Sequence, residues 1–267
     1  MIDTGNAKKP TAKRRVTDSR SILGTVAFAI LGGGIVMMLH ADTPLTVADY
    51  QHDPTLIVEA YRHVEAASVS DAEEQLLHQK RYMSHRMQAI FPTKFAGTAL
   101  TVLLKKEENN DPDALNGMLA AIDNGDAGSV YVVKVEDGED VAGVGGLMGT
   151  AMSARGFAGA VVDGGVRDLA QLKRIGFPVY ATGIVPSTAV SHYRFAGMNL
   201  PITVDGTPVA PNDIVVADQD GVVIVPRAHA AEVLLRAQQL DNTEHSMYPI
   251  IERLHSILDA VNQTGRL

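Results

Sequence analysis

An apolar strand that runs into a helix through a short glycine-rich turn is the feature that most constrains this chain. Residues 159–162 are apolar, Asp163-Gly-Gly-Val-Arg-Asp168 follows, and residues 169–175 have helical spacing. A cation beside a carboxylate, placed where glycines let the backbone approach a ligand, suits a small anion held next to a metal. Asp168 could also be only the N-cap of the next helix, so the turn alone leaves both interpretations open.

Segments with strand and helix spacing alternate along the body of the chain. Strands are expected at 97–104, 129–135, 159–162 and 177–182, and helices at 113–122, 147–155 and 169–175. Past Pro186 the pattern predicts short strands with hairpin turns at Asp205-Gly206 and Asp220-Gly221, and the chain is mainly helical from His229. This alternation predicts an α/β fold with a mixed or mostly parallel sheet and helices on its faces.

The region before the first of these strands is expected to be helical. Residues 54–67 have an apolar face at helical spacing, and the capping box Ser70-Asp-Ala-Glu73 predicts the start of a second helix. Residues 42–53 are expected as a linker. No composition shift divides residues 54–267, which are therefore expected to form one domain.

Composition excludes several classes of function. Residues 1–41 carry six Lys or Arg against two Asp, a net charge of +4. Because the net charge of the whole chain is −8, residues 42–267 carry −12. A body this acidic is a poor partner for nucleic acid phosphates. The chain has no cysteine, which excludes thiol nucleophiles, disulfides and thiolate zinc sites.

The N-terminal segment, residues 1–41, is expected to direct export. The run Ile22–Leu39 has eighteen residues without a charge, basic residues precede it and Asp42 follows it. That length is at the lower limit for a bilayer core of ~30 Å, and the charges predict a cytoplasmic N-terminus with the body outside the cytoplasm, in the periplasm. A cleaved signal peptide and an uncleaved membrane anchor both fit, and a buried helix is the less favoured alternative because Gly32-Gly-Gly34 would weaken it.

A second glycine-rich turn precedes the first by one strand–helix unit. Gly145-Gly-Leu-Met-Gly-Thr150 lies where an expected short strand at 141–144 leads into a helix. Free backbone N–H groups at such a helix start suit a carboxylate. Since the ends of adjacent parallel strands open into one crevice, the two turns together predict a shared site.

Several motifs in this order resemble the RraA-like family. The resemblance rests on Gly145-Gly-Leu-Met148, on Ala158-Gly-Ala-Val-Val-Asp-Gly-Gly-Val-Arg-Asp168, on Gly176-Phe-Pro-Val-Tyr-Ala-Thr-Gly183 and on Ala217-Asp-Gln-Asp-Gly-Val-Val-Ile-Val-Pro226. It extends over about residues 54–250 and leaves out the N-terminal segment. The family includes 4-hydroxy-4-methyl-2-oxoglutarate aldolases, oxaloacetate decarboxylases and proteins named for regulating ribonuclease E.

The resemblance implies a three-layer α/β sandwich of the swivelling phosphohistidine-domain type, assembled as a trimer or hexamer with sites between subunits. It implies that Gly145, Gly146, Leu147 and Met148 bind the carboxylate of a small 2-oxo acid. Arg167 would bind the 2-oxo acid and stabilise an enolate, and Asp168 would anchor a divalent metal, Mg²⁺ or else Mn²⁺. Oxygen ligands and retained waters are what Mg²⁺ prefers, so one carboxylate is enough.

One position departs from the family pattern. Active aldolases of the family carry an acid where this chain has Gly146, and loss of a general base typically costs ~10²- to 10⁴-fold. The function expected is therefore a metal-dependent lyase that forms a pyruvate enolate by retro-aldol cleavage or by oxaloacetate decarboxylation, with the balance shifted towards decarboxylation. Glu244 could supply a carboxylate across a subunit interface, and Asp163 and Asp140 are weaker substitutes. The alternative is a non-catalytic binding or regulatory protein.

Other polar residues are expected to have structural roles. Asp213 and Asp218 are expected to satisfy turn backbone rather than to bind metal. His78 and His85 are seven residues apart, which would place them on one side of a helix, but they lack a third ligand for a metal. His192 with Tyr193 could line a pocket.

Overall fold

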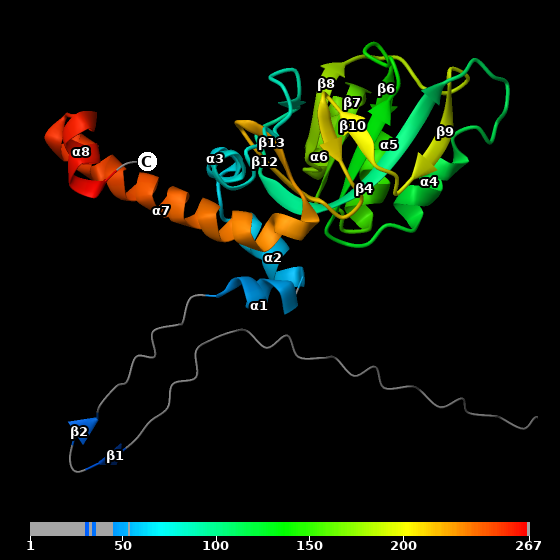
Figure 1. Cartoon of the computed structure of the whole chain (residues 1–267). Helices are drawn as coiled ribbons and strands as arrows, with labels where there is room; N and C mark the ends of the chain where they lie inside the picture. Colours follow the sequence, from blue (N-terminus) through cyan, green and yellow to red (C-terminus); the bar gives the residue numbers. More distant parts are fainter. Residues whose placement is uncertain (1–29, 32–33, 36–44, 53, 266–267) are drawn as a thin grey trace, which may run out of the picture. The chain divides into compact units, whose positions relative to one another are not determined.

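A computed structural model describes residues 30–31, 34–35, 45–52 and 54–265 of the 267-residue chain (Figure 1). The chain divides into two compact units, residues 1–45 and 46–267. In the first unit, β1 (Ile30–Leu31) and β2 (Gly34–Ile35) pair antiparallel. The rest of the expected signal or anchor segment lies outside the described residues, and none of the described helices is long and apolar enough to cross a bilayer. Export or anchoring therefore rests on the sequence alone.

The second unit is built on one mixed sheet, which confirms the predicted α/β class. Its strand order is β13-β12-β4-β5-β7-β8-β3, with β6 beside β7 and β9 beside β4. The parallel centre consists of β4 (Phe95–Lys106), β5 (Ser129–Val135), β7 (Gly159–Val166) and β8 (Val179–Ile184), joined by β6 (Ala142–Val144). The antiparallel members are β3 (Gln88–Ala89), β9 (Tyr193–Met198), β12 (Ile214–Asp218) and β13 (Gly221–Val225).

The segment around residues 81–89 brings the two edges of this sheet close to closure. Tyr82 bridges to Val223 on the β13 edge, and Met83 N–H donates to the carbonyl of Val222. A few residues later, β3 pairs with β8 at the opposite edge. The sheet therefore curls, and its inner face packs largely on itself.

Alternating residues of the strands divide the sheet into an inner and an outer face. In β5, Val130 and Val132 face the inner cluster, to which the separate hairpin of β10 (Ile202–Val204) and β11 (Thr207–Val209) also contributes. The neighbouring Tyr131 and Val133 face an outer cluster covered by helices. This period of two is what a strand with both faces buried requires. The mixed sheet is thus confirmed, and the swivelling-domain type stays a prediction.

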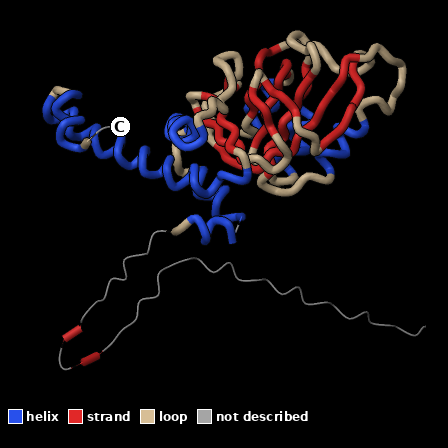
Figure 2. Tube along the Cα trace, viewed as in Figure 1, coloured by secondary structure: helices blue, strands red, loops and turns tan. Residues whose placement is uncertain are grey.

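Helices cover the outer face in two groups (Figure 2). One group packs on the parallel strands and comprises α4 (Asn116–Asp123), α5 (Gly146–Ala154) and α6 (Leu169–Ile175). The other packs on β12 and β13 and comprises α1 (Val47–His52), α2 (Pro54–Tyr61), α3 (Ala66–Leu77) and the long α7 (Ala230–Leu254). A short turn of 3₁₀ helix (Arg227–His229) precedes α7, and α8 (Ile257–Thr264) packs against it.

Three expectations for the N-terminal half of this unit were wrong. Residues 47–52, expected as linker, form α1, because Tyr50 is buried in the cluster under α7. Ser70 does not start a helix. Instead α3 begins at Ala66, whose N–H donates a hydrogen bond to the Asp218 carboxylate at 2.8 Å. Since α3 ends at Leu77, His78 and His85 do not share a helix face.

The glycine turn expected after residue 162 was also wrong. β7 continues through Gly164 and Gly165 to Val166, with an irregularity in its pairing to β8 between Val162 and Gly165. Gly164 has φ +153°, a conformation that favours glycine. The expected hairpin turn at residues 205–206 is confirmed. The second expected hairpin is also present, but its turn lies at residues 219–220, and Gly221 is the first residue of β13.

Candidate active site

The two glycine-rich segments meet beyond the carboxyl ends of two neighbouring parallel strands, as predicted. β6 and β7 pair in parallel, and the Arg167 amide donates to the carbonyl of Val144 at 3.1 Å, so both strands end side by side. Gly145 and Gly146 begin α5 directly after β6. Arg167 and Asp168 lie between β7 and α6. The predicted site residues on these two connections are therefore brought together.

Asp168 links the two connections and is not a side-chain helix cap. Its Oδ2 accepts the N–H of Gly146 at 2.9 Å, and it makes no capping hydrogen bond to α6. Its backbone is left-handed, with φ 59°, which Asp tolerates better than most residues. The side chain stays 51% exposed. Asp168 is thus positioned by α5 while its carboxylate remains accessible to a ligand.

Arg167 is held by two contacts that leave it partly exposed. Its Nη1 donates to the Ser187 carbonyl at 3.1 Å, and its Nε lies 3.8 Å from Oδ2 of Asp168. The side chain is 41% exposed. A guanidinium oriented in this way still has N–H groups available for an anionic ligand.

Glycine is required where α5 approaches this pair. A Cβ on Gly145 would lie 2.9 Å from Oδ2 of Asp168 and 3.2 Å from the Arg167 side chain. A Cβ on Gly146 would lie 3.0 Å from Cβ of Asp168 and 3.1 Å from Cγ of Gln171. The space next to residue 146 is therefore already occupied by Asp168 and Gln171.

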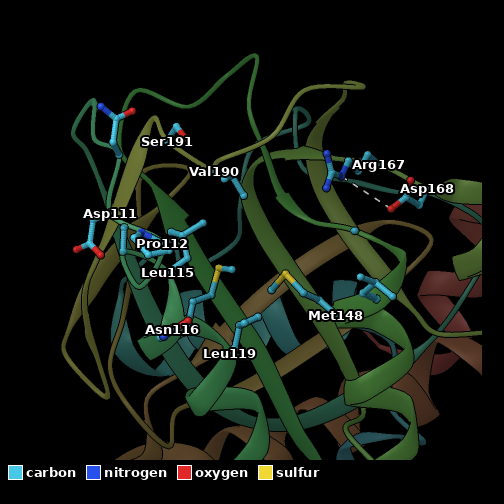
Figure 3. Close-up of a pocket in the computed structure, with 15 residues that line it drawn as sticks. Asp111, Pro112, Leu115, Asn116, Leu119, Met148, Arg167, Asp168, Val190 and Ser191 are labelled. Carbon is cyan, nitrogen blue, oxygen red and sulfur yellow. Dashed lines mark ion pairs between the residues drawn. The ribbon is translucent and has the colours of Figure 1, made fainter.

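A cavity of about 380 Å³ opens beside these residues (Figure 3). Gly145, Leu147, Met148, Arg167 and Asp168 form one part of its wall. The rest of the wall comes from the segment that leads into α4, from α4 itself and from the loop before β9, with Asn110, Asp111, Pro112, Ala114, Leu115, Asn116, Met118, Leu119, Val190 and Ser191. This second set was not predicted as a site, and the turn Asn109-Asn-Asp-Pro112 ahead of a helix was its only signal in the sequence.

The donor set at the cavity fits a hard divalent cation. Asp168 and Asp111 are the carboxylates among its lining residues, and the Asp111 carboxylate is already bound to Arg194 at 2.7 Å. A single accessible carboxylate suits Mg²⁺ or Mn²⁺, which keep several waters, better than a zinc site built from three or four protein ligands.

The other acidic candidates are not brought to this cavity within the chain. Glu244 lies on α7, accepts the Tyr248 hydroxyl at 2.8 Å and does not line the cavity. Asp163 is 8% exposed and is bound by Lys134 Nζ at 2.7 Å and by the Asp205 amide, so it cannot replace the missing acid at residue 146. Asp140 lines a different cavity, of about 770 Å³.

That second cavity contains His192 and Tyr193, as predicted, and the His192 ring lies 2.8 Å from Glu108. Asp213 and Asp218 bind backbone amides, Asp213 those of Ala210 and Arg227, so their predicted structural role is confirmed.

A separate group with metal-ligand geometry was missed by the sequence analysis. Ligand atoms of Glu65, Asp241 and His245 all lie within 4.8 Å of one another. A hydrogen bond to the Asp241 carbonyl raises the pKa of His245, and the nearby carboxylates add to this. The three residues belong to the α3 and α7 region, and their only sequence signal was the spacing of Asp241 and His245 on one helix face.

Comparison with known proteins assigns the chain to a family. A family model described as Aldolase/RraA matches residues 66–224. The chain belongs to the RraA-like family. A Burkholderia multivorans protein, provisionally named a 4-hydroxy-4-methyl-2-oxoglutarate aldolase, is 38% identical over 132 residues, which cover 49% of this chain and 75% of that protein.

Other relatives of this RraA-like chain match over shorter stretches. A Halalkalibacterium halodurans protein with the same provisional name is 36% identical over 84 residues, which cover 32% of this chain and 40% of that protein. The Methanocaldococcus jannaschii protein MJ0644 is 30% identical over 118 residues, which cover 44% of this chain and 56% of that protein. The chain thus spans only about half the length of these two relatives. The provisional names support a lyase-type reaction for the family.

Solved structures agree with this assignment. An uncharacterized protein from Pseudomonas syringae pv. tomato aligns with a TM-score of 0.71 at 26% identity, over 85% of this chain and 99% of that one. Streptomyces coelicolor RraAS2, described as an unusual member of the RNase ES inhibitor RraA family, aligns with a TM-score of 0.63 at 27% identity, over 71% of this chain and 94% of that one.

Proposed function

We propose that this protein is a lyase that cleaves small 2-oxo acids through a pyruvate enolate and depends on a divalent metal. The observation that carries the proposal is the pair of Arg167 and Asp168, partly exposed at one wall of a cavity and facing the first turn of α5. The family's provisional aldolase names support the same reaction class.

In this proposal the first turn of α5 binds the substrate carboxylate. Leu147 and Met148 belong to a turn whose N–H groups have no partner inside the helix, and the helix dipole adds positive potential there. Arg167 binds the 2-oxo group and stabilises the negative charge that develops on its oxygen as the C–C bond breaks. Its contact with the Ser187 carbonyl orients the guanidinium before substrate arrives.

Asp168 would hold the metal, Mg²⁺ or Mn²⁺, largely through water. When bound, such an ion acts as a Lewis acid towards the substrate oxygen. The hydrogen bond from Gly146 keeps the Asp168 carboxylate in place.

Gly146 shapes the reaction that this site performs best. Retro-aldol cleavage requires a base to remove the proton of the 4-hydroxyl group, and no carboxylate of residue 146 is available for that. Decarboxylation of oxaloacetate reaches the enolate by loss of CO₂ and needs no such base. We therefore expect decarboxylation to be the faster reaction, and retro-aldol cleavage to depend on a base from elsewhere, such as Glu244 of a neighbouring copy.

The test measures pyruvate release by the purified full chain from oxaloacetate and from 4-hydroxy-4-methyl-2-oxoglutarate, with Mg²⁺ or with EDTA. We expect metal-dependent release that falls by at least ~10²-fold in Arg167→Ala and in Asp168→Ala. Arg236→Ala, which removes an exposed hydrogen bond to Gln75, is the matched control. Pyruvate release that is reduced neither by these two substitutions nor by EDTA would contradict the proposal.

A non-catalytic regulatory role is the second candidate, favoured by the similarity to RraAS2. It predicts no turnover of any 2-oxo acid by a folded protein, together with binding to a ribonuclease. The accessible carboxylate of Asp168 argues against it, because a regulator does not need one beside a cation.

A further inference from the structure

The start of α3 meets the middle of α7 at a group of three titratable residues. The two helices pack on each other in the cluster that covers β12 and β13 (Figure 1). Glu65 directly precedes α3, and Asp241 and His245 lie one turn apart on α7. One ligand atom of each residue lies within 4.8 Å of the other two. All three residues come from one chain, and none of them lines the cavity beside Arg167.

Asp241 is held in place by α3 and keeps one carboxylate oxygen available. Its Oδ1 accepts the backbone N–H of Glu65 at 3.3 Å and the hydroxyl of Ser68 at 3.4 Å. Its Oδ2 lies 3.6 Å from Nδ1 of His245 and accepts no hydrogen bond from the part of the chain that the structure describes. The first oxygen therefore fixes the side chain, and the second can bind a ligand.

The orientation of His245 leaves its outer ring nitrogen free for a metal. Nδ1 lies 2.8 Å from the backbone carbonyl oxygen of Asp241, and because a carbonyl oxygen can only accept, Nδ1 carries the proton. In the neutral ring Nε2 then holds a lone pair, and it lies 3.6 Å from Oε1 of Glu65. A metal-bound histidine almost always donates its other ring N–H to a carbonyl or carboxylate in this way, which fixes the ring.

The spacing of these atoms fits ligands of one ion better than direct hydrogen bonds. A separation of 3.6 Å between ring nitrogen and carboxylate oxygen is too long for an N–H···O bond, which measures ~2.7–3.2 Å. Two ligand atoms that each lie ~2.0–2.1 Å from a tetrahedral ion are ~3.3 Å apart. Within the described structure, Glu65 and Asp241 form ion pairs only with His245, so a divalent cation would balance the charge of both carboxylates.

We propose that Glu65, Asp241 and His245 bind a Zn²⁺ ion that joins α3 to α7. One imidazole nitrogen and two carboxylate oxygens form a mixed ligand set that suits Zn²⁺, and a water molecule completes the four ligands. Mg²⁺ suits this group poorly, because it favours oxygen ligands in octahedral geometry. The side chains of Glu65 and His245 are 43% and 50% exposed, so they are free to close the remaining distance around the ion. The site does not depend on the proposed lyase function.

Calorimetric titration of Zn²⁺ into the full chain without a histidine tag tests the site. Excess Mg²⁺ keeps the Asp168 carboxylate occupied, and we expect one Zn²⁺ per chain. His245→Ala and Asp241→Asn should each lower the Zn²⁺ affinity at least about tenfold. The asparagine retains an oxygen that can accept the hydrogen bonds of Glu65 and Ser68, so the second variant removes little besides the charge.

His229→Ala is the matched control. His229 directly precedes α7, lies 3.7 Å from the Glu232 carboxylate and has a side chain that is 46% exposed, but it does not belong to the three-residue group. Its replacement should leave the Zn²⁺ affinity unchanged.

Thermal unfolding gives a second measurement. An ion that binds the folded state raises Tm, so Zn²⁺ added to the Mg²⁺-loaded protein should raise the Tm of wild type and of His229→Ala but not that of His245→Ala. In EDTA the three proteins should unfold within a few degrees of one another, because the group is partly exposed. That result would show that His245→Ala is folded and has lost only the ion.

The outcomes separate this site from the proposed lyase function. Wild-type protein that binds no Zn²⁺ in the presence of Mg²⁺ overturns the proposal, and so does an affinity that neither His245→Ala nor Asp241→Asn lowers. Zn²⁺ binding that disappears in Asp168→Ala would assign the ion to the other site and also overturns it. Absence of pyruvate release with intact Zn²⁺ binding would overturn the lyase function alone.

Discussion

At the scale of single residues, Gly146 links the position of Asp168 to the missing acid of the family pattern. Its N–H binds the Asp168 carboxylate, and the space where its side chain would begin is filled by Asp168 and Gln171. Gln171 is held there by its own hydrogen bonds to Thr150 and Arg174. The glycine is therefore part of a local arrangement and not an isolated replacement.

Adding a side chain at this position should disturb Asp168. Gly146→Ala places a Cβ about 3.0 Å from Cβ of Asp168, so one of the two must move. We expect pyruvate release to fall by about tenfold or more, with a stability loss of only ~1 kcal/mol because the site is partly exposed. Steady-state kinetics and urea denaturation measure the two effects. The double variant Gly146→Ala/Gln171→Ala should recover part of the lost activity, and an unimpaired Gly146→Ala would contradict this account.

A buried carboxyl group, Glu73, is expected to contribute to the pH dependence of stability. It is 0% exposed on α3, and neither of its oxygens has a hydrogen-bond partner within the described structure. Burial raises the pKa of Glu73 from 4.5 to about 8, Arg81 opposes that rise, and Asp213 adds to it. The folded state therefore holds a proton on Glu73 that the unfolded chain releases above its lower pKa.

The free energy of unfolding should consequently fall as the pH rises from about 4.5 to about 8. Below that window both states are protonated, and the contribution is fully present. We expect Glu73→Gln to remove this fall, so that the variant gains stability relative to wild type by up to ~1.4 kcal/mol per pH unit across the window. Urea midpoints at several pH values measure it. Parallel curves for the two proteins would show that Glu73 does not titrate in this range.

At the scale of elements, the continuation of β7 is what delivers Arg167 to the site. The sequence indicated a turn at Gly164-Gly165, because two glycines after an apolar strand usually end it. In the fold, Gly165 pairs with Gly183 of β8 and Ala142 of β6, so the strand lies between two neighbours up to Val166. Gly165 permits the close approach of Val141 and Val185, and the chain does not turn there.

A side chain at Gly165 should therefore destabilise the sheet beside the site. A Cβ there would meet the Val185 side chain and lie 3.0 Å from the carbonyl oxygen of Val141. We expect Gly165→Ala to cost ~1–3 kcal/mol, since overpacking of a buried strand forces backbone shifts. Urea denaturation gives the value, with Gly183→Ala in β8, where an added Cβ would lie no closer than 3.7 Å to its neighbours, as a comparison for the loss of a strand glycine alone. Adding Val185→Ala should recover only part, because the backbone contact remains, and full recovery would contradict a backbone clash.

At the scale of the whole molecule, a second carboxylate for the site would have to come from another copy of the chain. Within one chain Glu244 is bound to Tyr248 on α7 and lies outside the cavity lining. Leu147, at the cavity wall, is 90% exposed, which is unusual for a large apolar side chain and suits coverage by another copy. In the trimer or hexamer that the family resemblance implies, we expect Glu244 of one subunit to reach the site of its neighbour.

Mixing two inactive variants tests this arrangement. In retro-aldol cleavage, Arg167→Ala and Glu244→Gln should each be weakly active alone. Unfolding and refolding them together should restore this activity in mixed oligomers, because some sites then receive Arg167 from one chain and Glu244 from another. Light scattering gives the oligomeric state, and refolding each variant alone is the control. No gain in activity from mixed oligomers would mean that Glu244 acts within its own chain or not at all.

The sequence by itself determined the α/β class, most strand and helix positions and the meeting of Arg167 and Asp168 with Gly145 and Gly146. These follow from local periodicity and from the rule that parallel strand ends share one edge. Only the tertiary structure decided that Gly164 and Gly165 stay in the strand, that α3 starts at a carboxylate 152 residues away in the chain, and that α4 supplies an apolar cavity wall. The physical reason is that these outcomes depend on contacts between residues distant in sequence, and local propensity yields to burial and to hydrogen bonds that only the folded chain can form.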